Sequence, residues 1–304
     1  MLPNFLCIGA QKSGTTTLLN QLGRHPDIYM SPARETQFFL MDNLYSQGKV
    51  RYETAFFQTW DGQKAVGEKT PEYIYDPAVP GRIVETLGAQ VRLIATFRSP
   101  AQRAYSHYRH NFQQFWEDLG FEAALAAEQG RCAAGRFQKL RYSYLDRGRY
   151  ATQVARYLDA FPRQNLMFLV YEQEIVQQQM ETLKSIFGFL DVDTSWSPSG
   201  AVSAGRPSFT VPRFIQTDES IEIDGLKHLA KPGDLLLSRQ SMKPTLIRNP
   251  SDDLTAFARR VIVALPEAPA LTRAEELALN RSHFADDIHR LEDLIDADLG
   301  LWLD

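Results

Sequence analysis

The sequence predicts a three-layer α/β fold, in which a mostly parallel central sheet is flanked by helices and carries a P-loop-like turn. Two observations lead to this fold class. Short apolar runs alternate with stretches of helical periodicity, which is typical of a parallel sheet covered by helices. A glycine-rich turn also follows the first apolar run and opens a helix. With 304 residues, 44% of them hydrophobic, the chain can bury one large core, and we expect a single domain over residues 1–304.

The predicted strands are short apolar runs bounded by polar or glycine residues. They cover residues 5–8, 65–68, 91–97 and 165–170. Between and after them the apolar spacing is helical, over residues 15–23 and about 79–88, 100–115, 119–129, 149–161, 173–188, 252–264 and 272–297. Residues 195–250 lose this periodicity and gather prolines and glycines, so we expect a loop-rich lid that covers a substrate.

The overall composition limits the classes of partner and the cellular compartment that we expect. The formal charge is -4 and the pI is near 5.9, so the total charge favours neither a nucleic acid nor an anionic membrane surface as a partner. Cys7 and Cys132 are the only cysteines, which excludes a disulfide framework or zinc site and favours a reducing compartment. The N-terminal apolar run is too short for a signal peptide, and no stretch approaches the ~18 apolar residues of a membrane span. We expect a cytoplasmic protein, or a domain of a larger one, and the sequence predicts no oligomeric state.

The turn at residues 9–16 reads Gly-Ala-Gln-Lys-Ser-Gly-Thr-Thr. Its glycines have the spacing of a Walker A loop, in which backbone N–H groups and the N-terminus of the following helix hold anionic oxygens. A nucleoside triphosphatase carries a lysine directly after the second glycine, where it serves a magnesium triphosphate. Here Thr15 occupies that position, and the lysine, Lys12, lies inside the loop. In this displaced position, the lysine would stabilise a different bridging oxygen, without magnesium. The simpler alternative is an ordinary strand-to-helix turn, and the displaced lysine favours the functional interpretation over it.

A second anion site is predicted where the strand over residues 91–97 ends. Arg98 follows that strand, Pro100 suits the first turn of the next helix, and Ser106 comes about two turns later. Ligands of open α/β sheets bind at the carboxyl ends of strands, and an arginine offers a planar fork for a phosphate. Arg98 and Ser106 are therefore a candidate pair for one phosphate monoester. The alternative is an arginine that caps a helix or pairs at the surface.

Together, the two motifs resemble those of the sulfotransferase family, whose donor is 3′-phosphoadenosine 5′-phosphosulfate (PAPS). The glycine loop looks like the family's 5′-phosphosulfate loop, and Arg98, Pro100 and Ser106 are similar to its 3′-phosphate motif. The resemblance implies sulfuryl transfer without a metal ion, with Lys12 assisting departure of adenosine 3′,5′-bisphosphate. It implies donor contacts from Gln11, Lys12, Ser13, Gly14, Thr15, Thr16, Arg98 and Ser106. Arg206, in an Ala-Gly-Arg tripeptide where many relatives have Lys-Gly-Arg, is a further phosphate candidate.

Sulfuryl transfer requires a base, because the attacking oxygen or nitrogen loses a proton. The segment 66–71 places Glu68 at the carboxyl end of a strand, beside Lys69. It resembles a Glu-Lys element of the glycan-modifying branch of the family, in which the glutamate is the base. Glu68 is therefore the predicted catalytic base, and Lys12 and Lys69 are expected to lower its pKa. A surface ion pair is the structural alternative, and His107 is the rival base.

The acceptor side is predicted from one further segment. Residues 34–39 resemble the family segment that lines the acceptor cleft, so the candidate substrate contacts are Arg34, Glu35, Phe38, Phe39 and Lys69. The alternative for the phenylalanines is a place in the core. Small-molecule, carrier-bound and glycan acceptors are all compatible with the sequence, and the mildly acidic charge slightly favours a small molecule over a polyanionic glycan. Two other functions fit the glycine spacing, a magnesium-dependent phosphotransferase (kinase) and a non-catalytic nucleotide-binding module.

Overall fold

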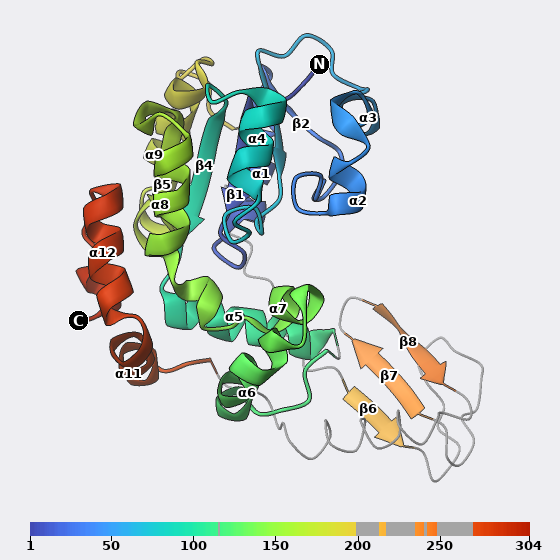
Figure 1. Ribbon diagram of the computed structural model, residues 1–304, viewed down its shortest axis with the longest axis vertical. Coiled ribbons are helices and arrows are strands. Elements are labelled where there is room, and N and C mark those ends of the chain that lie inside the picture. Colours follow the sequence, from blue (N-terminus) through green and yellow to red (C-terminus); the bar gives the residue numbers. More distant parts are fainter. Residues whose placement is uncertain (115, 199–212, 217–234, 240–241, 248–269) are drawn as a thin grey trace. The chain divides into compact units, whose positions relative to one another are not determined.

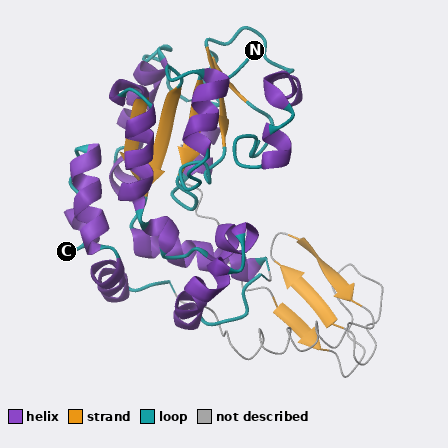
Figure 2. Cartoon of the chain, in the orientation of Figure 1, coloured by secondary structure: helices purple, strands orange, loops and turns teal. Residues whose placement is uncertain are grey.

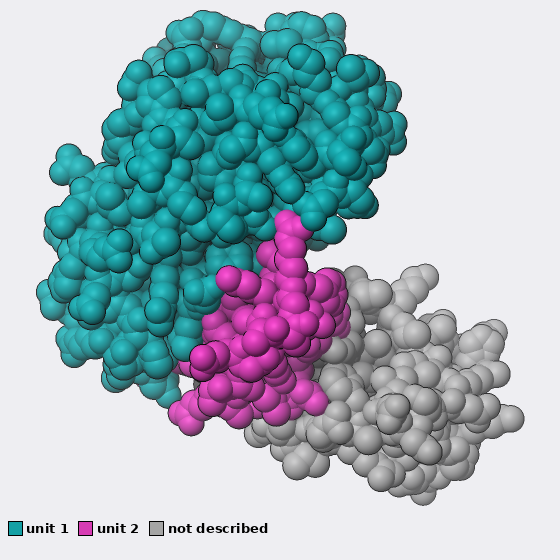
Figure 3. Space-filling view, in the orientation of Figure 1, with its two compact units in different colours: residues 1–104, 145–205, 273–304 teal, residues 105–144, 206–272 magenta. Residues whose placement is uncertain are grey.

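The computed structural model describes residues 1–114, 116–198, 213–216, 235–239, 242–247 and 270–304 (Figure 1). The contacts divide the chain into two compact units, which Figure 3 colours separately. The first, here called the α/β unit, comprises residues 1–104, 145–205 and 273–304, and the second unit comprises residues 105–144 and 206–272. Most predicted site residues belong to the α/β unit. A single domain over the whole chain stays a prediction.

The α/β unit is built on a five-stranded parallel sheet flanked by helices, which confirms the predicted fold class (Figure 1, Figure 2). The strand order is β2 (Ile28–Met30), β3 (Ala65–Lys69), β1 (Phe5–Gly9), β4 (Arg92–Phe97) and β5 (Leu166–Val170). The four predicted strands are confirmed. Strand β2 was missed because its three residues are too few to show a period.

Helices form the outer layers of this unit. The leucines of α1 (Thr15–Leu22) and α9 (Gln179–Leu190) pack in one buried cluster with Phe5 and Cys7 of β1. Alternate residues of a strand point to opposite faces, so the buried Leu6 and Ile8 face the other layer. There α8 (Tyr150–Ala160) packs with α4 (Val79–Leu87) and α12 (Ala285–Ile295). Burial on both faces explains why the strands read as continuous apolar runs. The other helices of this unit are α2 (Asp42–Tyr45), α3 (Gly48–Phe56) and α11 (Arg273–His283).

Two helical predictions differ from the structure in their boundaries. The pattern over 272–297 is divided into α11 and α12 at Phe284, whose φ of -130° leaves the helical region and whose ring is 1% exposed. The pattern over 173–188 begins with a π-helical turn at Tyr171–Gln177 before α9. Burial of the Phe284 ring explains the first break. Within the described ranges, no helix combines the length and apolar character needed to cross a membrane.

The second unit contains part of the predicted loop-rich lid, residues 195–250. Helix α5 (Pro100–Gln113) begins in the α/β unit and ends in this one, followed by α6 (Phe121–Ala133) and α7 (Arg136–Tyr142). A three-stranded antiparallel sheet, which we did not predict, lies within residues 195–250. Its strands have four to six residues and are β6 (Arg213–Gln216), β7 (Leu235–Arg239) and β8 (Met242–Ile247). Strands this short among prolines show no clear period. The rest of the lid and the predicted helix over 252–264 lie outside the described residues.

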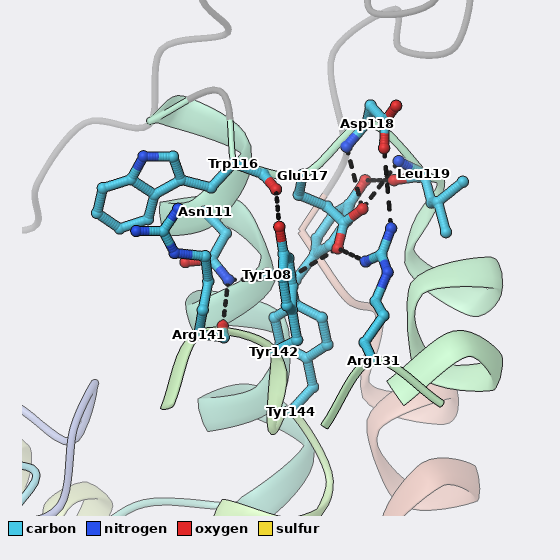
Figure 4. Close-up of polar contacts among 10 residues, drawn as sticks. All are labelled: Tyr108, Asn111, Trp116, Glu117, Asp118, Leu119, Arg131, Arg141, Tyr142 and Tyr144. Carbon is cyan, nitrogen blue, oxygen red and sulfur yellow. Dashed lines mark hydrogen bonds and ion pairs between the residues drawn. The ribbon is translucent and has the colours of Figure 1, made fainter. Parts of the chain in front are cut away.

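A completely buried carboxylate, Glu117, organises the helical part of the second unit (Figure 4). Its Oε2 accepts hydrogen bonds from Arg131 Nη1 at 2.6 Å and from Tyr144 OH at 2.8 Å. Its Oε1 accepts from the backbone N–H groups of Asp118 and Leu119 at 3.0 and 2.9 Å. Both oxygens are therefore satisfied, and the negative charge has a guanidinium beside it.

Candidate functional site

The glycine loop at residues 9–16 connects β1 to α1. Gly14 has φ +83° and Lys12 has φ +72°, a left-handed backbone that costs a residue with a side chain about 1–2 kcal/mol. Loops of this kind turn successive N–H groups toward one point and form anion-binding concavities. No side chain caps the N-terminus of α1, so its first N–H groups lack a partner within the helix. The loop therefore offers backbone donors and the positive end of a helix to an anion.

Side chains from two other segments hold this loop in place. The buried Thr96 hydroxyl of β4 donates to Ser13 O at 2.9 Å and to Gly9 O at 3.3 Å. Gln11 donates from Nε2 to Glu72 Oε1 at 3.0 Å. Hydrogen bonds thus attach the loop both to β4 and to the segment after β3. These attachments preserve the geometry of the loop before an anion binds.

Tyr171, the first residue after β5, contacts both the glycine loop and Arg98. Its ring packs so closely against Gly14 that a Cβ at Gly14 would lie 2.4 Å from Tyr171 Cε2. The Arg98 guanidinium lies over the same ring, 5.3 Å from its centroid. Arg98 Nη2 also donates to Gln102 Oε1 at 3.3 Å. We did not predict Tyr171 as a site residue, although its place at the carboxyl end of a predicted strand is a signal that could have found it.

Three predicted site residues fall outside the described α/β unit. Ser106 is half-buried on α5 in the second unit, and Arg206 lies outside the described residues. His107, the rival base, is 1% exposed and packs edge-on against the Tyr144 ring of its own unit, with centroids 5.0 Å apart. The phosphate contacts of Ser106 and Arg206 stay predictions. The surroundings of His107 are those of a structural histidine.

Glu68 lies in β3 but is completely buried. Tyr52 and Tyr73 donate their hydroxyl groups to Oε1 at 3.0 and 2.9 Å, and the Thr70 hydroxyl donates to Oε2 at 3.1 Å. The alternative of a surface ion pair is therefore wrong. The expected decrease in pKa is wrong as well, because burial raises the pKa of Glu68 and the hydrogen bonds from the surrounding hydroxyls only partly oppose this. Both carboxylate oxygens of Glu68 therefore accept hydrogen bonds from neighbouring hydroxyl groups.

The hydroxyls around Glu68 also fix the candidate acceptor segment, residues 34–39. Tyr73 OH lies 3.0 Å from Thr36 Oγ1 and accepts from Phe39 N at 3.2 Å. Thr70 Oγ1 accepts from Gln37 N at 3.1 Å. Two hydroxyls held by the Glu68 carboxylate therefore anchor Thr36, Gln37 and Phe39, and Glu68 is the structural centre of this segment.

Phe38 and Phe39 belong to the core. Their side chains are 2% and 0% exposed, and both rings pack against Tyr52, with centroids 4.2 and 5.2 Å away. Both phenylalanines therefore take the place in the core that we named as the alternative. The prediction that they line the acceptor cleft is wrong. A run of aromatic residues does not by itself distinguish a cleft wall from a core.

Lys69 connects the acceptor segment with the glycine loop. Its ammonium group donates to Thr16 Oγ1 at 2.9 Å and pairs with Glu35 Oε1 at 3.7 Å. The Lys69 side chain is 7% exposed and the Glu35 side chain 26% exposed. Burial and the neighbouring Glu72 raise the pKa of Glu35, against the opposing effect of Lys69. The exposed Arg34 precedes it.

These residues form an arrangement suited to transfer of an anionic group. A loop of backbone donors, with the buried ammonium of Lys69 beside it, stabilises negative charge, and the half-exposed Glu35 can take up a proton. Across the ranges that the structure describes, no group of three or more His, Cys, Asp or Glu side chains is arranged to hold a metal ion.

Comparison with known proteins identifies the family of the chain. The sulfotransferase domain family matches residues 2–204. The chain is 38% identical over 114 residues to the membrane-associated sulfotransferase kil1 of Dictyostelium discoideum, which covers 37% of this chain and 24% of that protein. It is 32% identical over 174 residues to heparan sulfate glucosamine 3-O-sulfotransferase 3B1 of Homo sapiens, covering 57% of this chain and 42% of that protein. The chain thus spans less than half the length of these curated relatives. A sulfotransferase from Alicyclobacillus acidocaldarius has a solved structure that matches over the full length of both chains, at 25% identity and a TM-score of 0.67.

Proposed function

The chain belongs to the sulfotransferase domain family, and from this premise we propose that it transfers a sulfuryl group from PAPS to a hydroxyl or amine of an acceptor. The observation that carries the proposal is the shared contact of Gly14 and Arg98 with the ring of Tyr171. PAPS is anionic at its 5′-phosphosulfate and again at its 3′-phosphate, so it needs two anion sites separated by one ribose. A loop of backbone donors and a guanidinium on one aromatic ring fit that requirement.

The residues at the loop divide the chemistry between them. The acceptor atom attacks sulfur, the bond from sulfur to the bridging oxygen breaks, and adenosine 3′,5′-bisphosphate leaves with the electron pair. Lys12 and the loop N–H groups would stabilise the charge that develops on this leaving oxygen. Lys69, held at Thr16 on the first turn of α1, adds a second positive charge beside the transferred group.

We assign the base to Glu35 instead of the sequence-predicted Glu68. A base must come within hydrogen-bond reach of the proton that it removes. Glu68 is completely buried, with both oxygens occupied by hydroxyl donors, whereas the Glu35 side chain is 26% exposed and pairs with Lys69 at the loop. A raised pKa also makes the Glu35 carboxylate a stronger base than an ordinary glutamate. Glu68 is the competing candidate, and a glutamine variant of each glutamate distinguishes the two.

The donor is tested by offering ³⁵S-labelled PAPS with three acceptor classes, in the presence of a chelator. The acceptors are a small-molecule alcohol panel, a carrier-bound hydroxyacyl chain and a heparan-type glycan, the last because one relative is named for heparan sulfate glucosamine. We expect label transfer without a metal ion, with the small-molecule panel as the first choice. Phosphoryl transfer from ATP with a strict need for magnesium would instead establish the phosphotransferase alternative.

Substitution of the loop lysine tests the leaving-group role. Lys12→Ala should lower kcat by about 10²–10³-fold, the typical effect of removing one donor to a developing negative charge. The matched control is Lys49→Ala, which removes an exposed lysine of α3 and should leave kcat unchanged. If both variants retain wild-type turnover, Lys12 has no part in the chemistry.

The base is tested with two isosteric variants. Glu35→Gln should lower kcat by about 10²–10⁴-fold, the usual contribution of a general base. Its affinity for adenosine 3′,5′-bisphosphate, measured by calorimetry, should remain that of the wild type. Glu68→Gln keeps an acceptor oxygen for the tyrosine hydroxyls and should retain turnover within about tenfold. The reverse ranking of the two variants would return the base role to Glu68.

A further inference from the structure

The turn at residues 98–100, which leads from β4 into α5, is held by side chains from distant parts of the chain. The first N–H groups of a helix have no partner within it and need a cap. Ser99 N donates to Glu172 Oε1 at 3.0 Å, and Ala101 N donates to Asn280 Oδ1 at 2.9 Å. Asn280 belongs to α11 and lies 179 positions after its partner. The helix that follows Arg98 therefore obtains a cap from the C-terminal segment, residues 273–304.

Asn280 is completely buried and uses both ends of its amide group. While Oδ1 caps α5, Nδ2 donates to Ser99 Oγ at 3.0 Å and to Trp302 O at 2.8 Å. The buried Trp302 in turn donates from Nε1 to Glu172 Oε2 at 3.2 Å. Trp302 thus links the two side chains that cap the turn, and the orientation of each is determined by the others.

A second chain of contacts reaches the Arg98 guanidinium itself. Gln102 accepts from Arg98 Nη2 through Oε1, and its Nε2 donates to Glu276 Oε2 at 3.0 Å. Glu276 lies on the first turn of α11, where its Oε1 pairs with Arg273 Nη1 at 3.2 Å. The guanidinium carries its N–H donors in a rigid planar fork. Contact of one edge with Gln102 and of one face with Tyr171 therefore sets the direction of the remaining donors.

Gly148 allows the C-terminal helices to come this close. A Cβ at Gly148 would lie 2.7 Å from Cε1 of Phe284, between α11 and α12, and 3.3 Å from Cβ of Pro100 in the turn. The first of these distances is shorter than carbon atoms tolerate. The absence of a side chain thus lets the aromatic ring and the turn share one small space.

We propose that the C-terminal segment is part of the donor site, because Asn280 and Glu276 position Arg98 for the 3′-phosphate of PAPS. The proposal rests on the proposed function and deepens it, since the matched family region ends at residue 204. Both side chains are positioning residues, and their effect reaches the phosphate through Arg98. By ordering the guanidinium before the nucleotide binds, they remove part of the entropy cost of binding.

The test is the gain in affinity that the 3′-phosphate provides. Calorimetry with the full chain measures Kd for adenosine 3′,5′-bisphosphate and for adenosine 5′-monophosphate, and their ratio is the 3′-phosphate preference. In the wild type we expect a preference of about 10–100-fold, as charge-assisted hydrogen bonds provide. Asn280→Asp replaces both Nδ2 donors by an acceptor and should lower this preference by about tenfold, because small misplacements of a binding group are costly. The Kd for the monophosphate should change little.

Controls separate positioning from a loss of structure. Arg281→Ala removes the neighbouring residue of α11, which donates to Leu303 O, outside the turn at residues 98–100, so the preference of this variant should equal that of the wild type. Should Asn280→Asp fail to fold by circular dichroism, Glu276→Ala decides, because it breaks the contacts through Gln102 and leaves Asn280 unchanged. Wild-type preference in a folded Asn280→Asp or Glu276→Ala variant would overturn the inference. A wild type with no preference at all would overturn the proposed donor site itself.

Discussion

Glu68 in the α/β unit and Glu117 in the second unit are both completely buried carboxylates, but different donors surround them. Glu117 accepts from the Arg131 guanidinium, two backbone N–H groups and a tyrosine (Figure 4). The described donors to Glu68 are neutral hydroxyl groups, and burial raises its pKa. A buried carboxylate with a cation beside it is stabilised in its charged form, whereas a buried carboxylate held by neutral hydroxyl groups alone is costly to ionise. Burial alone therefore does not define the role of a carboxylate.

The largest effect on stability is expected from breaking the charged pair in the second unit. Glu117→Gln leaves Arg131 without its carboxylate. Loss of one partner of a buried pair costs about 3–5 kcal/mol, and because Arg131 is 24% exposed we expect about 2–3 kcal/mol. Urea denaturation measures the loss, with the exposed Glu122→Gln of α6 as the control. A loss no larger than that of the control would remove the distinction between the two carboxylates.

A smaller effect should follow from removing single hydroxyls around Glu68. Tyr52→Phe deletes one donor and should cost about 1 kcal/mol. Tyr73→Phe also removes the acceptor for Phe39 N, and we expect the N–H that loses this partner to add about 1 kcal/mol, the lower end of the usual cost. Matched denaturation curves of the two variants give the difference. Equal losses would mean that Tyr73 does not support the acceptor segment.

The smallest effect concerns the charge on Glu68 itself. Because its pKa is raised in the folded state above the ordinary value of 4.5, the folded protein binds a proton that the unfolded chain has released. The stability that this proton contributes is fully present below the unfolded pKa and is lost as pH rises through the folded pKa. Thermal denaturation of wild type and Glu68→Gln between pH 4 and 8 should show the wild type losing stability relative to the variant as pH rises. A difference that changes in the opposite direction would contradict the raised pKa.

Features that depend on neighbouring residues were predicted well. The four predicted strands appear where their apolar runs lie, and the loop between β1 and α1 has its left-handed turn at Gly14. Arg98 follows β4, as its place after an apolar run indicated. Such features follow from the backbone freedom of glycine and from the period of a buried strand, which are local properties.

Features that depend on burial were predicted less well. Phe38 and Phe39 pack in the core, and Glu68 is enclosed, because Tyr52 of α3 covers all three. Nothing in the pattern around Tyr52 indicated that it would do so. The short strands β6 to β8 were missed for a related reason, since pairing with neighbours, not their own period, defines them.

The glycine spacing, the displaced Lys12 and the arginine after β4 follow from the order of residues, so the sequence alone predicted an anion-binding α/β protein. The phosphosulfate assignment came from the family resemblance. Tertiary contacts selected which groups the site presents. They left Glu35 partly exposed and Glu68 enclosed, and they joined Ser99 to Asn280 across 181 positions of the chain. The physical reason is that exposure and side-chain direction depend on packing partners far apart in sequence, whereas turn geometry and strand burial are encoded by adjacent residues.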